Sequence, residues 1–180
     1  MDLKIHLIIL AIGFLIILYN VIMVFYTNVP SVITKKYKIK NIIKYLEDFD
    51  INPNSIIYEL GSGWGDFSFA VEKFNPKKIT GYELSPLHVT YSKLKAKLIK
   101  SKACFFRKDF FHENISDADI IYLFLVPKIV NKLWLKIKKE CKPGTIVISL
   151  SDEIKSAILL KKIKTDPKKD NSSYFYFYQV

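Results

Sequence analysis

The sequence predicts an α/β protein with a doubly wound sheet, preceded by a helix that is long enough to span a membrane. Short apolar runs typical of buried strands alternate with amphipathic segments that have the period of a helix. This is the pattern of a mainly parallel sheet covered by helices on both faces. The first apolar run ends in closely spaced glycines, as the first strand of such a sheet does where the chain turns into a helix.

The membrane helix is predicted by a segment without Asp, Glu, Lys or Arg that runs from His6 to Tyr26. As a helix it spans about 31 Å, close to the ~30 Å hydrocarbon core of a bilayer. The alternatives are a buried core helix and a cleaved signal peptide, although a signal peptide has a shorter apolar region and a small-residue cleavage site. Lysines are frequent just after the segment, so the rest of the chain is expected to face the cytoplasm. We predict an uncleaved single-pass anchor in residues 1–28 and one domain in residues 29–180.

The composition narrows the choice of partners. The chain has 180 residues and a formal net charge of +11, which suits nucleic acid or an anionic membrane surface. The lysines are dispersed, without an Arg-rich block or an aromatic RNA-binding motif, so the membrane is favoured and no specific nucleic acid is expected. Cys104 and Cys141 lack metal-site spacing, and we expect free core thiols in a reducing compartment and no metal.

The elements around the first strand can be placed in order. Pro30 predicts an extended segment after the anchor, because the residue before a proline avoids helical angles. A helix follows, whose apolar residues recur at steps of three and four: Ile39, Ile42, Ile43, Leu46 and Phe49. The first strand, SIIYEL, starts at Ser55, and a helix from Asp66 to Phe74 follows the glycines.

The glycine turn within Ser55–Asp66 is the strongest functional signal. Its glycines, Gly61, Gly63 and Gly65, permit backbone angles closed to other residues and let a flat ligand lie against the main chain. The next helix directs free N–H groups toward the negative end of such a ligand. The spacing is G-x-G-x-G, whereas a dinucleotide fingerprint needs a glycine at Asp66. The alternative is an ordinary tight turn between a strand and a helix.

Three carboxylates follow three successive predicted strands. Glu59 ends the first strand, Glu83 ends the second (KKITGYE) and Asp109 ends the third (ACFFRKDF). At such strand ends, Glu83 is expected to accept both hydroxyl protons of a ribose, and Asp109 the exocyclic amine of an adenine. Each acid alone is more often a solvated surface residue. The three together favour a nucleotide-like cofactor.

The rest of the chain completes a Rossmann-like sheet of seven strands. Ser85 and Pro86 predict a helix start, and FFHENISDA is too short for a full crossover helix. ADIIYLFLV is apolar enough for the centre of the sheet, and a helix begins at Pro127. TIVISL is the fifth strand, and the tail predicts an antiparallel hairpin.

These motifs resemble the class I S-adenosylmethionine-dependent methyltransferases. The resemblance is most specific to the membrane-anchored lysine methyltransferases of the ATP synthase c-subunit type and their archaeal protein-lysine relatives. It extends over about residues 29–180, and rests on VPSVIT, YELGSGWGDF, GYELSP, KDFF, DIIYLFLVPKIVNKL and KPGTIVIS. This chain has Trp64 where the family usually has an acid, and Asp66 where a basic residue is frequent.

The resemblance implies a set of cofactor and substrate residues. S-adenosyl-L-methionine would be held by Glu59, Gly61, Ser62 and Gly63 near its methionine part, with Glu59 near the ammonium group, by Glu83 at the ribose, and by Asp109 and Phe110 at the adenine. Gly65 is also expected to bind the cofactor. The methyl-acceptor channel would be bordered by Pro30, Thr34, Leu125, Val126 and Pro127. No catalytic residue is assigned, because His88 and His112 match a general base by residue type only, and structural or surface roles are the alternative.

The function predicted from these observations is methylation of a lysine on a membrane or membrane-associated protein. The N/D-P-P-Y/F motif of base and glutamine methyltransferases is absent, which argues against adenine methylation. The alternatives are a methyltransferase acting on a lipid or quinone, a non-catalytic binding module with the same fold, and a nicotinamide-dependent reductase, which Asp66 disfavours. The acceptor, the number of methyl groups and the oligomeric state are not predicted.

Overall fold

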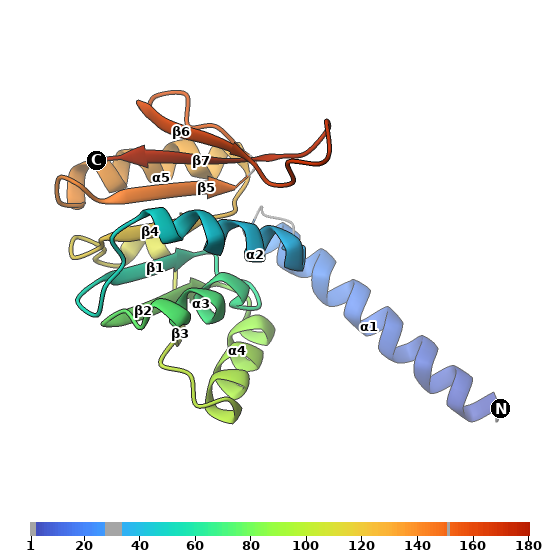
Figure 1. Cartoon of the computed structure of the whole chain (residues 1–180). Helices are drawn as coiled ribbons and strands as arrows, with labels where there is room; N and C mark the ends of the chain where they lie inside the picture. The colour runs from blue at the N-terminus through green and yellow to red at the C-terminus, as the bar shows by residue number, and fades with distance from the viewer. Residues whose placement is uncertain (1–2, 28–33, 151) are drawn as a thin grey trace. The chain divides into compact units, whose positions relative to one another are not determined.

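The computed structural model describes residues 3–27, 34–150 and 152–180, in two compact units, Met1–Val32 and Ile33–Val180. The first unit contains helix α1, Leu3–Thr27 (Figure 1). By length and composition the stretch Leu3–Phe25 can cross a membrane, a test that signal sequences and core helices also pass. Pro30 and most of the predicted VPSVIT segment lie outside the described residues, and the predicted boundary between residues 28 and 29 stays a prediction.

The second unit contains one sheet of seven strands. The strands are β1 Ile56–Leu60, β2 Lys78–Glu83, β3 Cys104–Arg107, β4 Ile120–Leu123, β5 Ile146–Leu150, β6 Leu159–Lys164 and β7 Tyr174–Gln179. Their order is β3-β2-β1-β4-β5-β7-β6 (Figure 1). The first five are parallel, and β7 runs antiparallel to both β5 and β6. The predicted Rossmann-like sheet, with β4 at its centre and a terminal antiparallel pair, is confirmed.

Helices cover both faces of this sheet. They are α2 Lys36–Tyr45, η1 Leu46–Asp48, α3 Asp66–Val71, η2 Glu72–Phe74, α4 Pro86–Leu98, η3 Phe110–His112 and α5 Pro127–Glu140. Alternate strand residues point to opposite faces. Ile57 and Ile79 therefore belong to the core beneath α2, α3 and α4, whereas Ile121 and Val147 belong to the core beneath α5. The helix predicted at Pro86 is confirmed, and the Ser85 side chain caps it by accepting a hydrogen bond from the His88 N–H.

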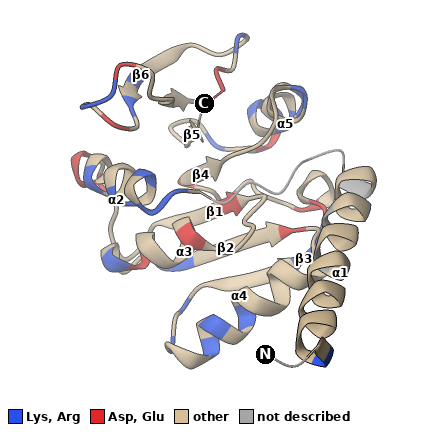
Figure 2. Cartoon of the chain, turned by 90° about the vertical axis from the view of Figure 1, so that its right-hand side faces the viewer, with Lys and Arg blue, Asp and Glu red and all other residues tan. Residues whose placement is uncertain are grey.

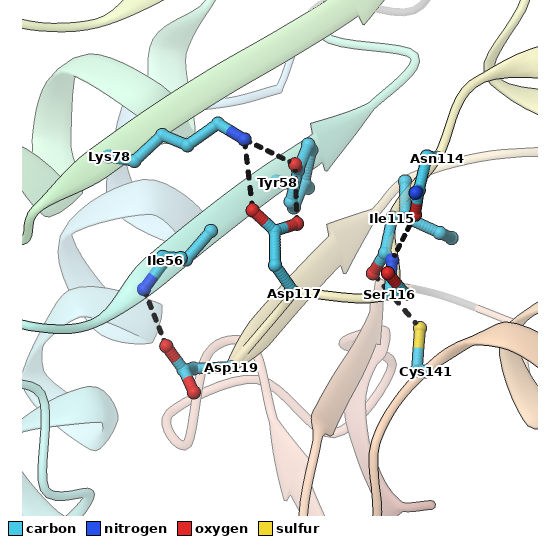
Figure 3. A network of polar contacts seen from close by, with 9 residues as sticks. All are labelled: Ile56, Tyr58, Lys78, Asn114, Ile115, Ser116, Asp117, Asp119 and Cys141. Atoms are coloured by element: carbon cyan, nitrogen blue, oxygen red, sulfur yellow. Dashed lines mark hydrogen bonds and ion pairs between the residues drawn. The ribbon is translucent and has the colours of Figure 1, made fainter.

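The connection between β3 and β4 contains the short turn η3 in place of a crossover helix. A polar network attaches this connection to the sheet. Tyr58 Oη donates a hydrogen bond to Asp117 Oδ1 at 2.7 Å, and Lys78 Nζ donates to Tyr58 Oη at 2.6 Å (Figure 3). Lys78 Nζ also contacts Asp117 Oδ2 at 3.1 Å. Burial raises the pKa of Tyr58 to about 12, so the phenol keeps its proton. The network attaches the loop before β4 to both β1 and β2.

A neighbouring carboxylate fixes the first residue of β1. Asp119 Oδ2 accepts a hydrogen bond from the Ile56 N–H at 2.7 Å (Figure 3). The other oxygen of Asp119 lies 2.6 Å from Lys142 Nζ, which follows α5. These contacts join three segments of the chain at the amino-terminal edge of the sheet.

Two expectations about β3 are wrong. The strand ends at Arg107 and not at Asp109, which instead begins the turn η3. Cys104 was expected in the core, but it is exposed, whereas Cys141 is buried. The reason is the position of β3 at the edge of the sheet, where a side chain has a neighbouring strand on one side only.

Candidate functional site

The glycine turn after β1 has the backbone conformation that the sequence predicts. Gly61, Gly63 and Gly65 have φ angles of +76°, +48° and +74°, which other residues rarely adopt. A Cβ atom on Gly61 would lie 2.6 Å from Leu125 Cδ2, and one on Gly65 would lie 2.6 Å from the Phe105 ring. No heavy atom lies within 4 Å of a Cβ built on Gly63. The turn is therefore tightly packed at its two ends and open at its middle glycine.

Glu83 connects the end of β2 to this open glycine. Its Oε2 accepts a hydrogen bond from the Gly63 N–H at 2.9 Å, and its Oε1 accepts one from the Ser85 N–H at 2.8 Å. Figure 2 shows acidic residues in red at the carboxyl ends of both β1 and β2. The prediction that the second strand ends in Glu83 is confirmed, and its hydrogen bond to Gly63 places this carboxylate beside the glycine turn.

Glu59 lies beneath the turn and supports the start of α3. It is buried, and its Oε2 accepts hydrogen bonds from the Ser68 N–H at 2.9 Å and from Ser68 Oγ at 2.6 Å. Burial raises the pKa of Glu59 to about 8, although the hydrogen bonds from Ser68 act in the opposite direction. Ser68 was not predicted as part of the site. Its place in the first turn of the helix after Asp66 was the available signal.

Two buried hydroxyl groups near the turn have no hydrogen-bond partner among the described residues. They are Ser62 Oγ and Tyr122 Oη. Tyr122 is the neighbour of Glu59 in the β1–β4 register, and its ring stacks on Phe67 with centroids 4.0 Å apart. Burial, followed by the charge of Glu59, holds the pKa of Tyr122 well above its usual range. Ser62 is adjacent to open Gly63, so an unpaired hydroxyl lies next to the accessible main chain.

Trp64, at the position where the family usually has an acid, packs against α4. Its ring centroid lies 4.2 Å from that of His88 and 4.9 Å from that of Tyr91. His88 is buried, and burial lowers its pKa despite the nearby charge of Glu83. This contact gives His88 a packing role, in agreement with the structural alternative. His112 is largely exposed on η3.

The structure places the residues expected near an adenine at the start of η3. Asp109 Oδ1 accepts a hydrogen bond from the Phe111 N–H at 2.9 Å and thereby caps this turn. Its other oxygen lies 3.8 Å from His112 Nε2. Phe110 is buried in the core on the α5 side of the sheet.

Of the residues expected to border an acceptor channel, Leu125 lies against the glycine turn. Leu125 is buried and packs closely over Gly61. Val126 is half-buried, and exposed Pro127 is the first residue of α5. Thr34 is half-buried just before α2.

Sequence reasoning also missed Gly81, in the middle of β2. A Cβ atom there would lie 2.6 Å from the Phe105 ring and 2.9 Å from Ser62 Cβ. Gly81 thus lets the glycine turn and β3 approach the same strand. A glycine inside a strand pattern was the available signal, because it often marks a close approach.

Comparison with known proteins identifies the family. Residues 59–157, more than half of the chain, match the ANTKMT methyltransferase domain. The chain belongs to this family. The match confirms the predicted class I methyltransferase and, with it, S-adenosylmethionine as the cofactor.

Individual methyltransferases resemble the chain over most of its length. A protein-lysine N-methyltransferase of Saccharolobus islandicus is 28% identical over 83% of this chain and 93% of its own length. The adenine nucleotide translocase lysine N-methyltransferase of Mus musculus is also 28% identical, over 68% of this chain and 52% of its own length. The solved RNA methyltransferase of Salinibacter ruber, in complex with S-adenosyl-L-homocysteine, has a TM-score of 0.71 and 24% identity, and the alignment covers 83% and 94% of the two chains.

The residues around the turn fit the methyltransferase cofactor. Gly63 leaves the main chain open, the adjacent Ser62 has an unpaired hydroxyl, and Glu83 is hydrogen-bonded to the same glycine. Together they offer a small hydroxyl group and a carboxylate beside accessible backbone. Within the described residues, no group of three or more His, Cys, Asp or Glu side chains is arranged to hold a metal ion.

Proposed function

We propose that this protein is a membrane-anchored methyltransferase that transfers a methyl group to lysine side chains of a membrane or membrane-associated protein. The observation that carries the proposal is the junction of Gly63 and Glu83, an open glycine hydrogen-bonded to a strand-end carboxylate, in a chain of the ANTKMT family. The two relatives named for lysine methylation support the choice of acceptor. Helix α1 supports the choice of a membrane location, and the lysines that follow it are the reason to place the catalytic domain on the cytoplasmic side.

We assign the binding roles as follows. The turn Gly61–Gly65 and Ser62 contact the methionine part of the cofactor, and Glu83 accepts hydrogen bonds from the ribose hydroxyls. Asp109 and Phe110 frame the adenine. Glu59 acts from beneath the turn, where it holds the start of α3 through Ser68.

The reaction requires little acid–base chemistry from the protein. The cofactor supplies a methyl group on a sulfonium, which accepts direct in-line attack by a neutral amine. A lysine has a reference pKa near 10.4, so only about 0.1% of it is neutral near pH 7.4. An apolar channel favours the neutral amine by desolvation. Binding of the lysine and the cofactor in fixed positions favours the in-line geometry. Leu125, Val126, Pro127 and Thr34 are assigned to this channel, and Pro30 is assigned to it from the family resemblance alone.

A matched pair of glycine variants tests the proposal. Gly63 and Gly144 both have positive φ angles, +48° and +92°, and neither has a heavy atom closer than 3.9 Å to a built Cβ atom. Gly144 lies after α5, at the amino-terminal edge of the sheet. Gly63→Ala therefore fills the proposed cofactor site, whereas Gly144→Ala imposes backbone strain elsewhere.

The full-length protein and both variants are incubated with host membranes and S-adenosylmethionine that carries a radiolabelled methyl group. We expect label in a protein band, recovered as methyl-lysine after hydrolysis, with the wild type and Gly144→Ala but not with Gly63→Ala. Label in lipid or quinone would keep the enzyme and reject the acceptor. If the purified wild type binds S-adenosylhomocysteine but labels nothing in a broad set of membranes, a binding module becomes the better explanation.

A further inference from the structure

Helix α4 has two apolar faces. Val89 and Ala96 face the core beneath α2, α3 and α4. The other face carries Tyr91, Leu94 and Leu98, with exposed fractions of 44%, 56% and 74%. Residues at steps of three and four form one line along a helix. We call Tyr91, Leu94 and Leu98 the outer stripe of α4.

Lysines lie on both sides of the outer stripe. At 3.6 residues per turn, Lys95 and Lys97 fall on opposite flanks of the line through Leu94 and Leu98. Lys95 is half-buried, and its Nζ lies over the Phe69 ring, 4.2 Å from the centroid, and 5.9 Å from the centroid of Tyr91, whereas Lys97 is exposed. Figure 2 shows Lys and Arg positions in blue along α4.

The charge along this segment has one sign. No Asp or Glu occurs from Pro86 to Lys108, whereas the segment contains several lysines. At the other end of the stripe, the half-buried Trp64 ring packs edge-on against Tyr91. Trp and Tyr are the side chains enriched where a protein meets the headgroup region of a bilayer. An apolar line between lysines, ending in two aromatic rings, is the composition of a helix that lies in a membrane surface.

We propose that the outer stripe of α4 lies on the surface of an anionic bilayer, with Lys95 and Lys97 at the lipid phosphates. An anionic bilayer is the partner that matches both an exposed apolar line and flanking charges of a single positive sign. The inference goes beyond the proposed activity and rests on the proposed membrane anchor.

The contact has a consequence for the site. Helix α4 begins three residues after Glu83, whose carboxylate holds the open glycine of the turn. A helix lying on the bilayer therefore places the carboxyl-terminal edge of the sheet close to the lipid surface. A substrate lysine just above the membrane is then within reach of the cofactor site, whereas a lysine far out in the cytoplasm is not.

Nitroxide labels at three positions of the full-length protein test this contact in reconstituted vesicles. The background carries Cys104→Ser, because Cys104 is exposed, whereas Cys141 is buried and burial raises the pKa of its thiol to about 11. Leu94→Cys reports on the outer stripe. Leu135→Cys, 67% exposed on α5 and on the other side of the sheet, is the matched control. Ile12→Cys in α1 reports on the anchor.

The measured quantity is the ratio of label collisions with oxygen, which concentrates in bilayers, to collisions with a water-soluble nickel chelate. In vesicles with phosphatidylglycerol we expect a ratio several-fold higher at position 94 than at position 135. The ratio at position 94 should fall in vesicles of phosphatidylcholine alone, and also in the variant Lys95→Gln/Lys97→Gln. Position 12 should give a high ratio in both lipids.

Other outcomes distinguish the surface contact of α4 from the membrane anchor α1. Equal ratios at positions 94 and 135, with a high ratio at position 12, would overturn the α4 contact and leave the anchor intact. A low ratio at position 12 would overturn the anchor, and a high ratio at position 94 in the same sample would support the surface contact alone. Collisions of the label at position 94 with the nickel chelate could instead decrease as the protein density in the vesicles rises, with no dependence on lipid charge. This result would overturn the lipid contact, because a second copy of this chain would then cover the outer stripe. Thermal unfolding of each labelled protein controls for folding.

Discussion

At the amino-terminal edge of the sheet two carboxylates each pair with a lysine, whereas at the carboxyl-terminal edge two others bond to neutral groups. Asp117 pairs with Lys78, and Asp119 pairs with Lys142. Glu59 and Glu83 receive hydrogen bonds from backbone N–H groups and one serine hydroxyl. Among the ion pairs of the described residues, none includes either glutamate.

The pKa values at the two edges follow this difference. Partial burial opposes the charged form of Asp117, but hydrogen bonds from Tyr58 and Lys78 outweigh it and lower the pKa of the carboxyl. Burial raises the pKa of Glu59 to about 8. The amino-terminal edge thus supplies its own counter-charges. At the carboxyl-terminal edge, neither glutamate has an ion-pair partner among the described residues, which suits a cofactor that brings hydroxyls and positive charge.

The largest expected effect is that of Glu83→Ala on cofactor affinity. The substitution removes the acceptor for Gly63 and Ser85 and the proposed ribose partner. We expect the affinity for S-adenosylhomocysteine to fall about 100-fold, which corresponds to about 2.7 kcal/mol. Isothermal titration measures this change, and circular dichroism shows whether the domain stays folded. Unchanged affinity in a folded protein would show that the ribose partner is misassigned.

Replacement of Glu59 by glutamine should abolish a pH dependence of stability. The folded pKa of about 8 lies above the ordinary value of 4.5, so the folded state retains a proton that the unfolded state loses between these values. Wild-type stability should therefore fall as the pH rises from about 4.5 to about 8. The neutral glutamine avoids this loss, so Glu59→Gln should be more stable than the wild type at pH 9, by on the order of 4 kcal/mol, and nearly equal to it at pH 5.

Thermal unfolding in detergent at pH 5, 7 and 9 measures this difference. Ser68→Ala is the control for the hydrogen bonds of Glu59, because it removes the hydroxyl donor without changing charge. A Glu59→Gln protein that is less stable than the wild type at every pH would indicate a carboxylate that is ionised throughout.

At the opposite edge, Asp117→Ala should change stability and not affinity. The substitution leaves Tyr58 and Lys78 without their shared acceptor, and because Asp117 is about half exposed we expect a loss of only about 1 kcal/mol. Thermal unfolding and titration with S-adenosylhomocysteine on the same sample separate the two effects. A loss of affinity comparable to that of Glu83→Ala would mean that the two edges do not act independently.

The sequence by itself determined the elements and the centre of the site. Apolar runs and helical periods predict all seven strands because they follow from local chain geometry. The glycines predict positive φ angles because no other residue adopts them easily, and all three have them. The carboxylate at the end of β2 lies beside the turn because the carboxyl ends of neighbouring parallel strands share one edge.

Only the tertiary structure decided which groups meet. Glu59 is held by Ser68 because α3 folds back over β1, and Cys104 is exposed because β3 lies at the sheet edge. The two apolar faces of α4 are indistinguishable in the sequence, and packing on the sheet selects the one that is buried. Such contacts depend on strand order and on the docking of helices, which are long-range properties that a local pattern does not contain.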